Sequence, residues 1–121
     1  MIHRDDEEHS VPKPWRAKFR KIAEAFAAGD LQLCDAQVDG VEPIDRATAD
    51  SIAANVASYE DQLAPLNEAT WNRSVCRWMG DYWLVLVDLT TAKEAVSDLT
   101  LQAKVYDESG RHIKIESVHV P

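Results

Sequence analysis

The feature that most constrains the fold is a run of five apolar residues, Trp83–Val87, inside a longer strand-like stretch. Residues 71–79 and 82–91 are rich in aromatic and β-branched side chains, and Gly80-Asp81 between them is typical of a tight turn. A strand that is apolar on both faces is covered on both sides or lies inside a sheet. The run therefore predicts a β-hairpin whose second strand is central.

A second hairpin is predicted towards the C-terminus. Apolar residues occupy every second position over residues 99–105, and residues 107–110 have the composition of a turn. Ile113 keeps the inward phase in the strand that follows, but Val118 has the opposite parity. A β-bulge near residues 116–117 would place both on one face.

Two amphipathic helices are predicted before the hairpins. The first has Pro14 in its first turn and ends before Gly29, and the second begins with Asp45 or Thr48 as its cap. Their apolar stripes follow helical spacing and consist of Trp15, Phe19, Ile22 and Phe26 in the first helix and Ala49, Ile52, Val56 and Tyr59 in the second.

This order of elements predicts the α+β class. We expect two N-terminal helices packed on a four-stranded antiparallel sheet that is built from two consecutive hairpins. Residues 1–12 are charged and lack periodicity, so we expect a flexible acidic tail there. Residues 13–121 are expected to form a single α+β domain.

The acidic charge is concentrated in the middle of the sequence. The chain carries 13 Lys and Arg against 21 Asp and Glu, a net charge of −8. Residues 29–70 alone sum to −8, whereas residues 13–28 sum to +4. The balance argues against nonspecific nucleic-acid binding. Two interpretations stay open: a solvated face with helix caps, or a surface that attracts a basic partner.

The sequence contains no motif for catalysis, a metal or a cofactor. It has no His pair or Cys pair at metal-binding spacing and no phosphate-binding glycine loop, so no cofactor and no metal are expected. Cys34 and Cys76 are expected to be reduced thiols. The start lacks an apolar leader and no apolar run is long enough to cross a membrane, so we expect a cytoplasmic protein without a membrane partner.

Four aromatic residues lie close together in the sequence around the first hairpin. They are Trp71, Trp78, Tyr82 and Trp83. They suit an aromatic core with cross-strand pairs, but exposed members would be anchors for a partner. The sequence leaves both readings open.

Three stretches carry a family resemblance: AFAAGDLQLCDAQVDGVEPI, TWNRSVCRWMGDYWLVLVDLT and SDLTLQAKVYDESGRHIKIESVHVP. The best-marked part is W-x-R-S-V-x-R-W-M-G-x-Y-W from Trp71 to Trp83. From about residue 13 onwards, the chain resembles a family of small bacterial proteins of unassigned biochemistry. Such proteins are similar to the immunity proteins of contact-dependent growth inhibition, which neutralise a toxin delivered by a neighbouring bacterium. The resemblance supplies no catalytic motif.

The resemblance and the charge together imply a non-enzymatic immunity protein. Its expected partner is a cognate toxin domain, for instance a basic nuclease, and it would bind no nucleic acid and be a monomer or weak homodimer. The expected partner-binding residues are Asp30, Asp35, Asp39, Glu42, Asp45, Glu60, Asp61 and Glu68. The alternative is a cone-shaped α+β protein, which binds a small ligand or acts as an isomerase or dehydratase in a pocket between helix and sheet.

Overall fold

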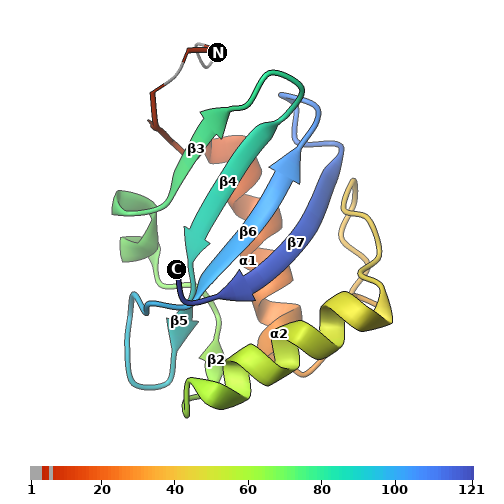
Figure 1. Ribbon diagram of the computed structural model, residues 1–121, viewed down its shortest axis with the longest axis vertical. Helices are drawn as coiled ribbons and strands as arrows, with labels where there is room; N and C mark the ends of the chain where they lie inside the picture. The colour runs from red at the N-terminus through yellow and green to blue at the C-terminus, as the bar shows by residue number, and fades with distance from the viewer. Residues whose placement is uncertain (1–3, 6) are drawn as a thin grey trace.

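Two α-helices and two antiparallel sheets make up the chain in the computed structural model, which describes residues 4–5 and 7–121 (Figure 1). In spatial order the larger sheet consists of β1 (His9–Ser10), β3 (Val75–Trp78), β4 (Trp83–Asp88), β6 (Thr100–Val105) and β7 (Ile113–His119). The smaller sheet pairs β2 (Leu63–Ala64) with β5 (Thr90–Thr91).

The predicted first hairpin and the central place of its second strand are confirmed. β3 and β4 pair antiparallel around Gly80-Asp81, and the Met79 N–H donates to the Tyr82 carbonyl at 2.9 Å. β4 lies between β3 and β6. The first strand starts later than predicted, because Trp71 belongs to a short 3-10 helix, η1 (Glu68–Asn72).

The predicted bulge in the last strand is also confirmed. Ala103 of β6 pairs with Ile115, but the preceding Gln102 pairs with Ser117, so Glu116 is the extra residue. The shift restores the inward phase, and Ile115 and Val118 are both buried.

Helix α1 (Lys13–Ala27) covers one face of the larger sheet and lies behind it in Figure 1. All four residues of its predicted stripe are buried, and the ring centroids of Trp15 and Trp83 in β4 are 6.2 Å apart. The helix ends as expected, because Gly29 adopts a φ of +88° just after it. The contact between Trp15 and Trp83 lies within the hydrophobic core.

Helix α2 (Arg46–Ser58) lies along the edge of the larger sheet, beside β7. Asp45 caps it by accepting the Thr48 N–H at 2.7 Å. The Asn55 side-chain amide donates to the Val118 carbonyl of β7 at 2.8 Å. This bond satisfies one backbone carbonyl that an edge strand would otherwise leave free.

The expected architecture is wrong in its number of strands and in the place of the second helix. The structure is α+β, but the main sheet has five strands, a second sheet has two, and α2 packs at an edge. The additional strands β1, β2 and β5 have two residues each. Strands this short cannot show the two-residue periodicity on which sequence prediction relies.

The segment expected to be a tail contributes one of these strands. His9 pairs with Cys76 and Ser10 with Val75 in β3. Val11, next in the chain, is buried. Residues 1–3 and 6 of the expected tail lie outside the described residues.

Candidate functional site

The connection between α1 and α2 is an ordered loop, which we call the acidic loop (residues 30–45). Its base is closed, because the Ile44 N–H donates to the Gln32 carbonyl at 3.4 Å and the Gln32 side chain donates to the Ile44 carbonyl at 3.3 Å. Leu33 and Val38 are buried inside it. Compact surface loops with close ends and their own packed side chains are frequently functional.

Asp30 organises the start of the acidic loop. Its carboxylate accepts the N–H groups of Ala36, Cys34 and Asp35 at 2.8, 2.9 and 3.0 Å. These bonds, that from Ala36 most of all, hold the pKa of Asp30 below its ordinary value. Asp30 is therefore a structural residue of the loop and stays ionised at neutral pH.

The far end of the acidic loop is joined to β7. The Ile113 N–H donates to the Gly40 carbonyl at 2.8 Å, and the Glu42 N–H donates to the Ile113 carbonyl at 2.9 Å. A Cβ atom on Gly40, whose φ is +79°, would lie 2.5 Å from the Arg111 carbonyl oxygen. Only glycine fits this approach, so the loop is fixed at both ends.

Five of the eight predicted carboxylates bond within the chain. Asp30 and Asp45 bond to the backbone as described, and the Asp61 carboxylate accepts the Gln62 N–H at 2.8 Å. Glu68 forms two bonds with the Arg20 guanidinium at 2.7 and 2.9 Å, which lower the pKa of Glu68. Glu42 lies 2.9 Å from the His112 ring nitrogen. These five carboxylates therefore fit the interpretation of a solvated face with helix caps and local ion pairs, and not that of a binding surface.

The other three predicted residues, Asp35, Asp39 and Glu60, are exposed, and their side-chain carboxylates make no hydrogen bond or ion pair among the described residues. The Lys18 Nζ donates to the backbone carbonyl of Asp39 at 2.7 Å. Asp35 and Asp39 lie on the acidic loop with Glu42. Glu60 follows the far end of α2, whose 13 residues span about 20 Å. The structure therefore brings Asp35, Asp39 and Glu42 onto one loop, but not Glu60, Asp61 or Glu68.

A row of mostly aromatic side chains crosses the end of the sheet next to this loop. The strand register makes Met79, Tyr82, Tyr106 and His112 neighbours across the four main strands, and we call them the aromatic row. Ring centroids lie 5.9 Å apart between the two tyrosines and 4.7 Å apart between Tyr106 and His112. Met79 is 48% exposed and Tyr106 is 40% exposed.

This row is not apparent in the sequence as a unit. Met79 and Tyr82 flank the first hairpin turn, and Tyr106 and His112 flank the second. Pairing the two predicted hairpins side by side would have aligned them. The row is continuous with the acidic loop through the contact between His112 and Glu42.

The tryptophans are not the exposed anchors that the sequence left open. Trp15, Trp71 and Trp83 are buried. Trp78 is half-buried beneath the Arg4 guanidinium, which lies 4.3 Å from its ring centroid. The exposed aromatic surface belongs instead to Tyr106 and its neighbours in the row.

The space between α1 and the sheet, where the alternative function requires a pocket, is filled by side chains. Trp15, Phe19 and Ile22 from the helix and Val85 and Val87 from β4 are all at most 1% exposed. Cys76 is buried in the same layer, and desolvation raises its pKa to about 11. A thiol in this state is protonated and unreactive.

An open depression of about 800 Å³ lies on the acidic loop. Cys34 and Asp39 are among its lining residues. Within residues 4–5 and 7–121, no three His, Cys, Asp or Glu side chains gather as metal ligands. Across the same residues, no helix has the length and apolar character needed to span a membrane.

Comparison with known proteins places most of the chain in one family. A family model described as a domain of unknown function, DUF7668, matches residues 23–121. No curated protein and no solved structure matches the chain.

Proposed function

We propose that this chain, which belongs to the DUF7668 family, is an immunity-type protein that binds and neutralises a cognate bacterial toxin domain. The proposal starts from the sequence resemblance to small bacterial immunity proteins. It assigns the contact to the acidic loop, with the aromatic row as its border. The partner is a protein with a basic surface, such as a nuclease toxin whose cleft binds phosphates.

One observation supports this assignment most strongly. Asp35 and Asp39 are exposed on a loop that is fixed at both ends, and their carboxylates make no ion pair among the described residues, although the Lys18 Nζ donates to the Asp39 backbone carbonyl at 2.7 Å. A fixed loop loses little conformational entropy on binding. Unpaired carboxylates attract a basic protein over a distance and so raise the rate of association.

The aromatic row adds large aromatic side chains that can be buried on binding, which a charged loop lacks. Tyrosine, methionine and arginine are enriched in protein interfaces, and a few buried aromatic anchors supply most of the binding energy. Tyr106 reaches the acidic loop through His112 and Glu42. A partner centred on the loop can therefore cover both charged and aromatic groups.

Charge reversal tests the proposal. In Asp35→Lys/Asp39→Lys, the association rate with a candidate basic toxin domain should fall about tenfold at low salt, while the dissociation rate changes less than about threefold. The control is Glu24→Lys/Asp98→Lys, which makes the same charge change at exposed sites outside the loop and away from the aromatic row. Stopped-flow fluorescence at several salt concentrations measures both rates.

The salt dependence separates this account from a neutral contact. The rate for the unmodified chain should fall as salt rises, because exposed charges are screened beyond about 10 Å at 0.1 M salt. The loop variant should show a flatter dependence. Equal rates and equal slopes for the loop variant and the control would remove the acidic loop from the interface.

A further inference from the structure

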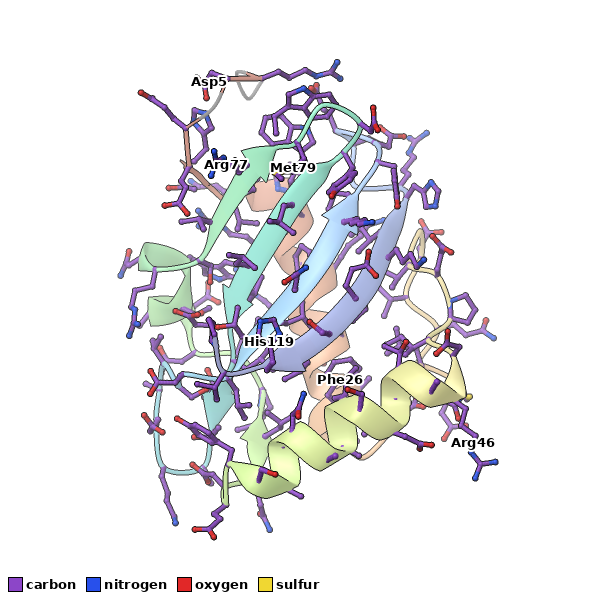
Figure 2. All side chains as sticks on the ribbon, viewed as in Figure 1. Asp5, Phe26, Arg46, Arg77, Met79 and His119 are labelled. Carbon is purple, nitrogen blue, oxygen red and sulfur yellow. The ribbon has the colours of Figure 1, made fainter. Side chains whose placement is uncertain are left out.

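We propose that the open face of the larger sheet is a second docking surface, which takes an acidic amphipathic helix of a partner protein. Helix α1 covers the opposite face, and no element of the described chain covers this one (Figure 1). Figure 2 looks onto the open face, with Arg77 and Met79 towards one end and His119 towards the other. This surface adjoins the aromatic row, because the Lys104 Nζ lies 4.6 Å from the Tyr82 ring centroid, but the proposal does not depend on the function proposed above.

The middle of the open face is apolar. Val75 of β3 pairs with Leu86 of β4, and Leu84 lies two residues away on the same face. All three side chains are half-buried, whereas their neighbours on the other face are buried by α1. A partner that covers them removes further apolar area from water, which is the main driving force of association.

A row of cations crosses this apolar centre, in a protein whose net charge is −8. Arg77 pairs with Leu84, Leu84 with Lys104, and Lys104 with Lys114, so the three cations lie in one line across the strands. We call Arg77, Lys104 and Lys114 the basic row. Lys104 forms an ion pair with Glu116 at 2.9 Å. Arg77 and Lys114 are exposed and form no ion pair within the described residues.

The carboxylates of the strand half lie mostly off this face. Asp81, Asp107 and Glu108 are in hairpin turns, and Glu94 and Asp98 are in the connection between β5 and β6. The two carboxylates on the face are paired, Glu116 with Lys104 at 2.9 Å and Asp88 with Arg73 at 3.5 Å. The centre of the face is therefore positive although the sequence around it is nearly neutral. Charge complementarity selects an acidic partner for this face.

The occupied sheet edges favour a helix over an added strand. β1 lies against β3, and the acidic loop and Asn55 bond to the backbone of β7. A second copy of the chain fits less well, because two positive faces repel each other. An acidic loop placed on the face of the next copy would make a heterologous, head-to-tail contact, whereas most homo-oligomers are two-fold dimers with the same patch on both subunits.

Two synthetic peptides of about 18 residues test the proposal. Both carry the same leucine stripe at helical spacing, flanked by glutamates in one and by lysines in the other. In an amide NMR titration of the full chain, the glutamate peptide should shift the signals of Val75, Leu84 and Leu86. The lysine peptide should leave these signals in place.

Matched variants make the test specific. Arg77→Glu/Lys114→Glu should weaken binding of the glutamate peptide about threefold to tenfold. Lys13→Glu/Lys21→Glu makes the same charge change at exposed positions of α1 and should leave it unchanged. Equal weakening by both variants, or shifts confined to other elements, would overturn the proposal.

A dimer would overturn the proposal in a different way. If light scattering finds a dimer that Leu86→Gln dissociates, then a second copy covers the face. Loss of toxin binding by the acidic-loop variant bears only on the proposed immunity function, so the two proposals can fail separately.

Discussion

At the scale of single residues, identical side chains have different roles. Asp30, Asp45 and Asp61 accept backbone hydrogen bonds that shape a loop or begin a helix. The carboxylates of Asp35 and Asp39, a few positions away, face solvent and make no hydrogen bond among the described residues. The role of an aspartate depends on which N–H groups the chain brings to it. A count of carboxylates in the sequence therefore overestimates the number that are available to bind a partner.

Asp30→Asn tests the structural role of that carboxylate. The pKa of Asp30 is lowered in the folded chain, so its contribution to stability is present above its unfolded pKa of about 4 and is lost as pH falls through the folded pKa. The variant should have a lower Tm than the parent chain at about pH 7, and the difference should shrink below about pH 4.

Thermal unfolding followed by circular dichroism over this pH range measures the effect. Asp39→Asn is the matched control, because it removes a loop carboxylate that has no described partner and should not reproduce the pH-dependent difference. A Tm difference for Asp30→Asn that is the same at every pH would contradict the assigned role.

The two cysteines should differ sharply in reactivity. Cys34 is exposed and Cys76 is buried with a pKa near 11. At about pH 8, a thiol reagent should modify Cys34 in the native chain and reach Cys76 only after denaturant is added. Mass spectrometry of the labelled chain identifies the site. Modification of both thiols at similar rates before unfolding would show that the core is open.

At the scale of elements, apolar periodicity predicted the helices and strands that are long enough to show it. The stripe on α1, both hairpins and the bulge at Glu116 follow from apolar spacing alone. The strands β1, β2 and β5 have two residues each, and they depend on tertiary contacts that sequence spacing does not encode. The same limit hid the aromatic row, which exists only once two hairpins are aligned.

Gly40 is the residue that holds the acidic loop against the sheet. Gly40→Ala should destabilise the fold about 2 kcal/mol more than Gly29→Ala, because both carry positive φ but only the Gly40 Cβ would clash with the Arg111 carbonyl. Denaturant unfolding gives the two free energies. If the two variants are equally stable, then the loop is not held against β7 as described.

At the scale of the whole molecule, charge is sorted by surface. The sequence correctly located the excess of carboxylates in residues 29–70, but it gave no sign of the basic row, because the strand half sums to −1. Cations occupy strand positions on one face while most carboxylates occupy turns. The net charge of a whole segment averages over the strand faces and the turns. Only the strand register shows that the cations and carboxylates are separated in space. The carboxylates of the acidic loop could therefore be located from the sequence, whereas the aromatic row and the basic row could not.

Identification of the bound partner tests the central claim most directly. The unmodified chain and Asp35→Lys/Asp39→Lys are each used to capture proteins from the host cell, and the captured proteins are compared by quantitative mass spectrometry. We predict that a toxin domain with a basic surface is enriched by the unmodified chain and reduced at least about tenfold with the variant. The claim is contradicted if no basic toxin domain distinguishes the two captures.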